Sequence, residues 1–310
     1  MSERKAIFVV GTTASGKSDW ALEMAEEVSG AILNCDSIQI YERLKIGSAQ
    51  PSPQDKARIP HHLFAYVSPP QEATAGEYRR THMEILKTLT TTAFVVGGTG
   101  FYFQALERGM FPAPAANEKI QQLIEAELAK PKGEEVLWNE LHHADPITSA
   151  KIHKNDHYRL VRALEVIRRE GRPLSEIKKI FESQTESYPI DYIKLGLHWP
   201  KEKLEVRVKA RTAKMLEQGL VEEVKDLLAQ GLESWAPLQS VGYKEVLTML
   251  AENKNQSWLK EEIIQNTMRL AKKQRTWFKR DSEITWFDGE SDLKKFKQQI
   301  RDFLRGPEKA

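Results

Sequence analysis

The feature that most constrains this chain lies close to its N-terminus. The stretch "GTTASGKS" matches G-x-x-x-x-G-K-[ST], follows the apolar run "AIFVV", and precedes a segment of helical spacing from Asp19 to Val28. A strand, a glycine-rich loop and a helix in this order form a phosphate-binding loop. The loop N–H groups and the helix N-terminus attract phosphate oxygens, and the last hydroxyl is a ligand for Mg²⁺. We predict that phosphate is bound by Gly11, Thr12, Thr13, Ala14, Ser15, Gly16, Lys17 and Ser18, and that Ser18 is the metal ligand.

Two more strand-like runs each bring a polar residue to their end. "AILNCDS" reaches Asp36, and "TAFVVGGTG" reaches Thr99 between glycines. Strands separated by helices predict a parallel α/β sheet, and ligands bind outside the carboxyl ends of such strands. We therefore expect the phosphate-binding loop, Asp36 and Thr99 to converge, although they are far apart in sequence.

The middle of the chain changes character near the prolines of "GMFPAPAANEK". Helical periodicity dominates from Lys119 to about Glu182, and "DYIKLGLHW" then returns to a strand pattern. The C-terminal part is helical apart from the short run "ITWF". We predict a helical insertion domain at 113–191 that splits an α/β core made of 1–112 and 192–310.

The cysteine content and the lack of long apolar runs indicate the compartment in which the protein is expected. Cys35 is the only cysteine, so no internal disulfide is expected, as in a reducing compartment. We find no apolar run long enough to span a bilayer, and the N-terminus lacks the apolar region of a signal peptide. These features favour a cytoplasmic protein with no membrane partner.

Positive charge gathers in one acid-free segment, although the net charge of the chain is only +2. The segment Thr267–Arg280 interleaves Trp277 and Phe278 with Arg269, Lys272, Lys273, Arg275, Lys279 and Arg280. Neutralised phosphates and stacked aromatics are typical of RNA binding. A solvated helix face above two core aromatics is the alternative, but the absence of acids favours a nucleic-acid partner.

Three further positions leave alternatives open. Asp36 is either a catalytic base or metal ligand, or the N-cap of a helix. The glycines around Thr99 permit a close backbone approach, although a plain strand-to-helix turn explains them better without context. Arg207 and Arg211 share one helix face and point either at a phosphate site or at surface glutamates.

Eight motifs occur in order between Ala6 and Phe287: "GTTASGKS", "NCDSIQIYERLKIGSAQPS", "HHL", "VVGGTGFYFQAL", "NDHYRLVRALEV", "LEVRVKARTAKML", "SVGYKE" and "AKKQRTWF". Together they resemble the tRNA dimethylallyltransferase (tRNA isopentenyltransferase) family of bacterial type. Each motif is weak alone, and their order makes the resemblance specific. It implies a P-loop NTPase-like core, similar to nucleotide kinases, with a helical insertion domain that contacts tRNA.

The resemblance also implies a reaction. The family transfers a dimethylallyl group from dimethylallyl diphosphate to N6 of adenosine-37, just 3′ of the anticodon, giving N6-isopentenyladenosine and diphosphate. Asp36 matches the proposed base, and Thr99 matches a position near the adenosine. Lys17, Mg²⁺ near Ser18 and Arg211 would stabilise the leaving diphosphate. The expected partner is the anticodon stem-loop of tRNA, which one chain can hold as a monomer.

The tRNA contacts implied by the family come from both the core and the insertion. They are Asp36, Ser37, Ile38, Gln39, Thr99, Gln121, Tyr158, Arg159, Leu160, Val161, Arg162, Ser240, Val241, Gly242, Tyr243, Lys244, Lys272, Lys273, Gln274, Arg275, Thr276, Trp277, Phe278 and Lys279.

Two other functions are weighed against this one. A P-loop kinase for a nucleotide or small molecule, which would bind ATP, needs a carboxylate where the third strand instead ends in "GGTG". A non-catalytic RNA-binding protein with a relic loop would have no need for intact Lys17, Ser18 and Asp36. Both fit the sequence less well than the transferase.

Overall fold

A parallel sheet forms the centre of the larger part of the chain. The computed structural model describes residues 4–109, 117–184 and 187–306. Neighbouring strands are all parallel, as predicted for an α/β fold. In the sheet order β3-β2-β4-β1-β5-β6, the strands are β1 (Lys5–Gly11), β2 (Ala31–Asn34), β3 (His61–His62), β4 (Ala93–Gly97), β5 (Asp191–His198) and β6 (Ile284–Asp288). Only the two-residue β3 has no counterpart among the predicted strands.

The register of the sheet brings three predicted site segments to one edge. β1 lies between β4 and β5, and Val10 is level with Gly97 on one side and Gly196 on the other. Asn34, at the end of β2, is level with Val96 of β4. The phosphate-binding loop and the residues after β2 and β4 therefore start from the same edge, because parallel strands end there together.

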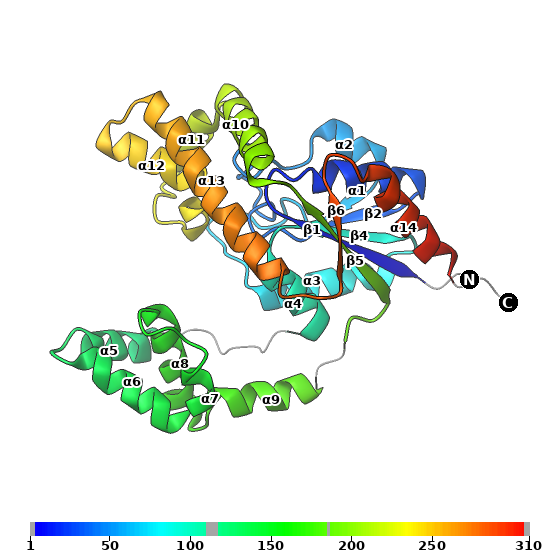
Figure 1. Cartoon of the computed structure of the whole chain (residues 1–310). Helices are drawn as coiled ribbons and strands as arrows, with labels where there is room; N and C mark the ends of the chain where they lie inside the picture. The colour runs from blue at the N-terminus through cyan, green and yellow to red at the C-terminus, as the bar shows by residue number, and fades with distance from the viewer. Residues whose placement is uncertain (1–3, 110–116, 185–186, 307–310) are drawn as a thin grey trace. The chain divides into compact units, whose positions relative to one another are not determined.

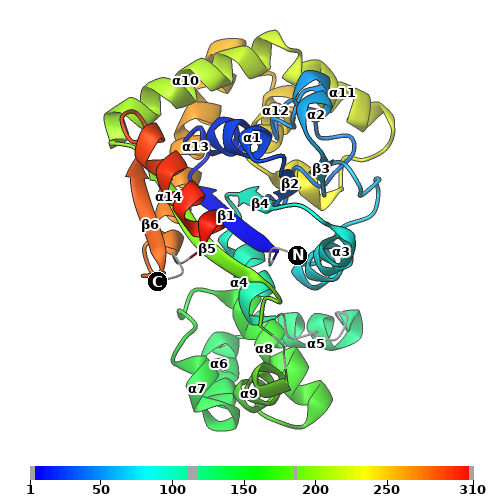
Figure 2. The ribbon, with the colours of Figure 1, turned by 90° about the vertical axis from the view of Figure 1, so that its right-hand side faces the viewer.

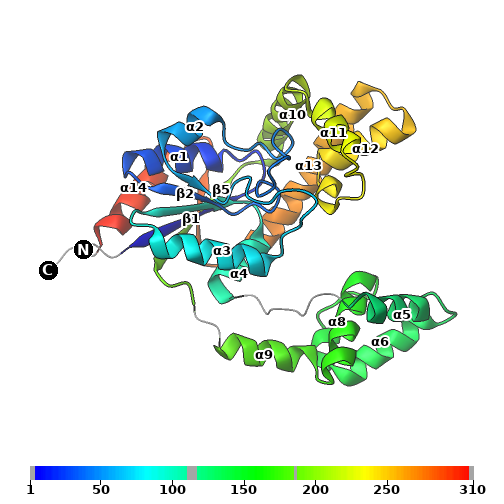
Figure 3. The same ribbon diagram turned by 180° about the vertical axis from the view of Figure 1, so that it is seen from behind.

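Helices cover both faces of the sheet (Figures 2 and 3). On one face α1 (Lys17–Glu27) and α14 (Leu293–Arg305) share an apolar core with the strands, in which Met24 and Phe296 are fully buried. On the other face α3 (Ala75–Thr88) and α4 (Gly100–Arg108) bring the rings of Tyr78 and Tyr102 into a stack with centroids 4.0 Å apart. α2 (Pro53–Arg58) is a short helix of the β2–β3 connection.

A group of helices gathers beside the edge where the strands end (Figure 1). α10 (Lys201–Glu217) packs against α13 (Gln256–Phe278) through Leu204, Val208 and Ala271. α11 (Leu220–Ala229), the 3₁₀ turn η1 (Ala236–Gln239) and α12 (Tyr243–Glu252) complete the group. Most of the basic segment lies in α13, but the helix ends at Phe278, so Lys279 and Arg280 follow the helix. If the whole segment were helical, Arg280 would share a face with Arg269, Lys272 and Lys273, and this expectation from the sequence is wrong.

The residues Glu107–Ser187 form a second compact unit, while Met1–Leu106 and Tyr188–Ala310 form the first. These bounds lie a few residues before the sequence-based limits of 113 and 191. The helices of the second unit enclose their own apolar core around Leu141, Leu160 and Leu164. They are α5 (Glu118–Leu128), α6 (Gly133–Ala144), α7 (Pro146–Ser149), α8 (His157–Glu170) and α9 (Leu174–Gln184). Among the described residues, no helix combines the length and apolar character needed to cross a bilayer.

Candidate active site

The loop between β1 and α1 is shaped to receive an anion. Gly16 has φ +84°, a left-handed conformation that glycine adopts freely, and Lys17 starts α1 directly after it. The first N–H groups of a helix have no acceptor within the helix, and its N-terminus favours negative charge. Lys17 Nζ folds back over the loop and donates to the carbonyl of Thr12 at 3.3 Å. Backbone N–H groups and an ammonium group therefore meet at one point.

Two side chains from outside the loop hold its carbonyl groups. Arg207 Nε donates to the carbonyl of Ala14 at 2.7 Å, and Trp199 Nε1 donates to that of Ser15 at 2.8 Å. The Arg207 guanidinium also lies 4.5 Å from the centroid of the Trp199 ring. Because both carbonyl oxygens already have donors, they oppose a bound anion less than unpaired carbonyls would. Arg207 thus supports the loop backbone, a role that helical spacing alone did not suggest.

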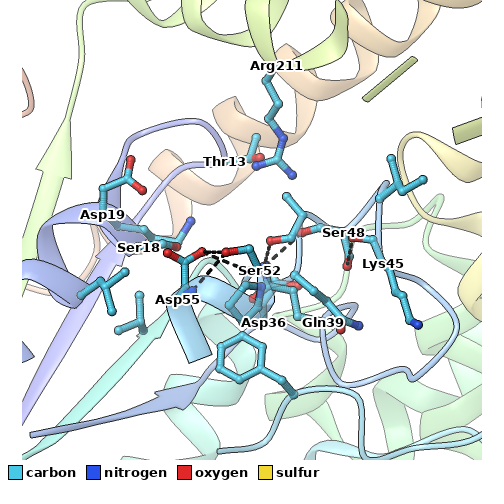
Figure 4. Close-up of a pocket in the computed structure, with 18 of the residues that line it drawn as sticks. Thr13, Ser18, Asp19, Asp36, Gln39, Lys45, Ser48, Ser52, Asp55 and Arg211 are labelled. Carbon is cyan, nitrogen blue, oxygen red and sulfur yellow. Dashed lines mark hydrogen bonds between the residues drawn. The ribbon is translucent and has the colours of Figure 1, made fainter. Parts of the chain in front are cut away.

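Lys17, Asp36 and Arg211 lie within electrostatic reach of one another. Burial lowers the pKa of Lys17 to about 8, while the Asp36 carboxylate acts in the opposite direction and Arg211 lowers the pKa further. Arg211 points from α10 into the pocket (Figure 4). Burial lowers the pKa of Arg211 as well, and Asp36 again opposes this effect. The cavity that these side chains line carries an excess of positive charge, which a diphosphate would complement. Its cations are Lys17, Lys45, Lys56, Arg207, Arg211 and Lys214, and its carboxylates are Asp19, Asp36, Glu42 and Asp55.

Asp36 is held by its neighbours in a fixed orientation. Its backbone N–H donates to Asn34 Oδ1 at 3.0 Å, and its carbonyl accepts from Asn34 Nδ2 at 3.0 Å. Its own Oδ1 accepts from the N–H of Ile38 at 2.9 Å, so one carboxylate oxygen is engaged within the loop. Turns rather than a helix follow Asp36, which is not a helix N-cap.

Thr99 lies beside the Asp36 loop. Its hydroxyl accepts from the N–H of Ser37 at 2.9 Å and lies 3.2 Å from the Ser37 hydroxyl. Its own N–H donates to the carbonyl of Cys35 at 3.3 Å. The turn after β4 and the loop after β2 are therefore joined next to Asp36, as their place on the sheet predicted.

One cavity of about 1330 Å³ is lined by the phosphate-binding loop, Asp36 and Arg211, whereas Thr99 is not among its lining residues. Its polar wall includes Lys17, Asp36 and Arg211, and Figure 4 shows Thr13 and Ser18 facing the same space. Its apolar lining is formed by Leu22, Ile32, Phe64 and Val96. The cavity therefore combines a cationic cradle, a carboxylate and an apolar wall, which suits a ligand that is partly anion and partly hydrocarbon.

Comparisons with known proteins give this arrangement a family. A family model described as IPP transferase matches residues 39–281, and a model described as isopentenyl transferase matches residues 4–59. The tRNA dimethylallyltransferase of Bdellovibrio bacteriovorus is 48% identical over 98% of this chain and 100% of its own length. The chain belongs to the tRNA dimethylallyltransferase family. This confirms the prediction from the eight ordered motifs that the chain resembles bacterial members of the family.

Solved structures of this family share the fold. The tRNA isopentenylpyrophosphate transferase of Bacillus halodurans superposes with a TM-score of 0.70 at 28% identity, covering 98% of this chain and 96% of that one. A eukaryotic dimethylallyltransferase described as acting on tRNA has a TM-score of 0.81 at 25% identity, covering 97% of this chain and 80% of that one. This chain therefore shares its P-loop-like α/β fold, including the added helices, with solved members of the family.

The family's implied tRNA contacts divide into exposed and enclosed positions in the core. On α13 the side chains of Lys272, Lys273, Arg275, Thr276 and Trp277 are exposed, as is Lys279 just beyond the helix, whereas Phe278 is buried and Gln274 half-buried. Gln39 Nε2 donates to the carbonyls of Ser48 and Ala49, and Ile38 and Ser37 are half-buried beside it. The exposed positions are available to a macromolecule, and the enclosed ones support the surface from below.

The segment "SVGYK" is mostly internal. Tyr243 is fully buried and donates to Glu223, and the N–H of buried Gly242 donates to Glu245 at 2.6 Å. Ser240 donates to the carbonyl of Pro237, while Val241 and Lys244 are half-buried. Most of this motif therefore packs inside the protein, and its Ser240, Val241 and Lys244 are the members that solvent partly reaches.

In the insertion the implied contacts are also mixed. Tyr158 is 80% exposed and Arg159 is exposed too, whereas Leu160 and Val161 are buried in the core of that unit. Gln121 donates to the buried Glu165 at 2.7 Å, and Arg162 pairs with the same carboxylate. Tyr158 and Arg159 are the members of this group that solvent reaches most easily.

Three residues of the site escaped the sequence reasoning: Asn34, Trp199 and Glu223. Asn34 had a usable indication, because an asparagine two residues before an aspartate at a strand end often caps the turn. Trp199 donates to the carbonyl of Ser15, and Glu223 accepts from the N–H groups of Lys45 and Ile46. Both contacts join segments far apart in sequence, and no local pattern indicates such partners.

Proposed function

We propose that this protein transfers a dimethylallyl group from dimethylallyl diphosphate to N6 of adenosine-37 in tRNA, releasing diphosphate. The single observation that supports this most is the shared cavity, where Lys17 of a phosphate-binding loop, the Asp36 carboxylate and an apolar wall occur together. A P-loop kinase fits less well, because the strand β4 leads into "GGTG" and not into the carboxylate that such a kinase needs. Membership of the tRNA dimethylallyltransferase family favours the same reaction.

The geometry suits the chemistry of this transfer. The bond between the allylic carbon and the diphosphate oxygen breaks, its electrons go to the diphosphate, and N6 of adenosine forms a bond to that carbon. Asp36 accepts the N6 proton as general base through the oxygen that Ile38 does not occupy. Lys17, Arg211 and the loop N–H groups stabilise the charge that develops on the leaving diphosphate. Thr99 holds the loop of Asp36 beside the reacting amine.

A divalent cation is part of the proposal. The Ser18 hydroxyl is exposed at the start of α1, and the carboxylates of Asp19 and Asp55 line the same cavity. Such oxygen donors are the ones that Mg²⁺ prefers, so the residues fit it. A bound Mg²⁺ would neutralise charge on the diphosphate, with Ser18 as its protein ligand.

The acceptor adenosine must leave its stack to reach Asp36, as in other enzymes that act on a base. We propose that the exposed cations of α13 grip the anticodon stem-loop while it does so. One chain contains every group that this reaction needs, so we propose a monomer, and we place it in the cytoplasm where tRNA is used.

The proposal is tested by one incubation. Unmodified tRNA, radiolabelled dimethylallyl diphosphate and Mg²⁺ are combined with the protein in the absence of ATP, and label is expected in the tRNA. No label in the tRNA, together with transfer of the γ-phosphate in a second incubation that contains γ-labelled ATP, would instead support the kinase alternative.

The variant Asp36→Ala, measured in the same assay, tests the role of Asp36 as general base. Loss of the base is expected to abolish label transfer while tRNA affinity stays nearly unchanged. Asp226→Ala is a matched control, because Asp226 is an exposed aspartate on α11 away from the cavity. A large loss of tRNA binding in Asp36→Ala would make Asp36 a tRNA anchor rather than a base.

A further inference from the structure

The side chain of Gln274 is turned into the protein although its segment is basic and exposed. Its Oε1 accepts from the N–H of Thr13 at 2.8 Å, and its Nε2 donates to the carbonyl of Gly98 at 3.0 Å. Gln274 is half-buried, while Lys273 and Arg275 on either side are exposed. One amide group therefore joins α13, the phosphate-binding loop and the end of β4.

The glycines after β4 make room for this contact. A Cβ atom on Gly98 would lie 2.4 Å from Gln274 Nε2, and one on Gly100 would lie 2.1 Å from the ring of Trp277. Gln274 and Trp277 are three residues apart and thus share a helix face. α13 therefore packs closely on "GGTG", and a side chain at Gly98 or Gly100 would have to displace Gln274 or Trp277.

We propose that Gln274 is a positioning residue for the phosphate-binding loop, acting through the amide of Thr13, and is not itself a contact to RNA. A carboxamide offers an acceptor and a donor at a fixed spacing, so meeting Thr13 and Gly98 together fixes its orientation. The loop then keeps its shape only while α13 is seated on β4. This proposal rests on the proposed function, since it assigns the loop to the prenyl diphosphate and α13 to tRNA.

Changes along α13 should therefore have different effects: loss of Gln274 should weaken diphosphate binding, whereas loss of the neighbouring lysines should weaken tRNA binding. Without the carboxamide, the N–H of Thr13 and the carbonyl of buried Gly98 lose their partner, which is costly for enclosed polar groups. The phosphate-binding loop would change its backbone conformation once these two hydrogen bonds are gone, and its other N–H groups would then bind diphosphate less well. Neighbouring lysines of α13 would still face tRNA unchanged.

Gln274→Met tests this, because methionine has a similar shape but cannot form either bond. We expect the KM for dimethylallyl diphosphate and the Kd for inorganic pyrophosphate to rise together by about tenfold, with tRNA affinity within about twofold. Gln265→Met is the matched control, since Gln265 is an exposed glutamine of the same helix. It should leave all three constants unchanged.

Gly98→Ala tests the same contact from the other side. Its added methyl group would displace Gln274 Nε2, so the same rise in KM is expected without any change at position 274. The double variant should be no worse than the more impaired single variant, because both remove one interaction. Additive effects of the two changes would contradict a shared contact.

Direct titration distinguishes failure of this inference from failure of the proposed function. If wild-type protein transfers no prenyl group, pyrophosphate affinity still reports on the loop. Weakened tRNA binding with an unchanged KM for the donor in Gln274→Met would overturn the proposal and make Gln274 an RNA contact. Unchanged constants in both Gln274→Met and Gly98→Ala would overturn it as well.

Discussion

At the residue scale, the site depends on how Asp36 is presented as much as on its presence. Fully buried Asn34 pairs with both backbone groups of Asp36 and also donates to the carbonyl of Leu63 at 3.0 Å. An aspartate at the end of a strand could be predicted from sequence as a site residue. Its orientation could not, because Leu63 belongs to a segment near β3 that only the folded chain brings to β2.

The pKa of Lys17 gives a pH prediction at the same scale. Its value of about 8 means that the ammonium form dominates below that pH and is lost above it. Since the charged form attracts the diphosphate, kcat/KM for dimethylallyl diphosphate should fall as pH rises through about 8. Bound diphosphate favours the charged lysine, so kcat at saturating donor should fall only at higher pH. Steady-state kinetics across neutral and alkaline pH, at saturating tRNA, measure both profiles.

A lysine-to-arginine change is the control for this assignment. The guanidinium of Lys17→Arg stays protonated throughout this range, so the fall near pH 8 should disappear from whatever activity remains. A wild-type kcat/KM that stays level well above pH 8 would contradict the role given to Lys17.

At the scale of elements, hydrophobic periodicity predicted the strands and helices well but not how they dock. β1, β2, β4, β5 and β6 all appeared as apolar runs in the sequence, and α13 includes the predicted basic segment as far as Phe278. The seat of α13 on the glycines at 98 and 100 joins segments 176 residues apart, as the bond from Gln274 to Gly98 shows. No local pattern carries that information, and the same is true of Trp199 and Arg207 on the phosphate-binding loop.

One carboxylate ties three elements around the cavity. Glu223 of α11 accepts from the N–H groups of Lys45 and Ile46 at 3.2 and 3.0 Å and from the Tyr243 hydroxyl of α12 at 2.6 Å. Lys45 and Ile46 line the cavity. Glu223 therefore holds the wall of the site onto α11 and α12.

Removing this tie should affect both stability and substrate binding. Glu223→Ala leaves two backbone N–H groups and a buried hydroxyl without their acceptor, which costs about 2 kcal/mol of folding free energy. We expect a lower melting temperature and a higher KM for the prenyl donor, measured by a thermal scan and by the label-transfer assay. Glu222→Ala is the matched control, because Glu222 is its exposed neighbour on α11. A Glu223→Ala protein with wild-type melting temperature and KM would show that the tie is dispensable.

At the scale of the whole molecule, charge distribution matters more than the net charge of +2. In the insertion, two arginines are paired within their own unit, since Arg168 pairs with Glu127 and Glu140 and Arg162 pairs with Glu165. On α13, by contrast, Lys272 and Lys273 have no acid within ion-pair distance among the described residues. We therefore expect Lys272 and Lys273, with the other exposed cations of α13, to attract a polyanion.

The salt dependence of tRNA affinity tests this distribution. Each lysine that neutralises a phosphate releases counterions, so removing it lowers the slope of log affinity against log salt by about one. Lys272→Ala with Lys273→Ala should therefore flatten the slope by about two and weaken binding for all tRNA sequences alike. Lys260→Ala, on the same helix beside Glu261 and Glu262, should change the slope little. An unchanged slope in the double variant would show that Lys272 and Lys273 lie on a solvated helix face and do not contact tRNA phosphates. The proposed tRNA-binding surface would then have to lie elsewhere on the protein.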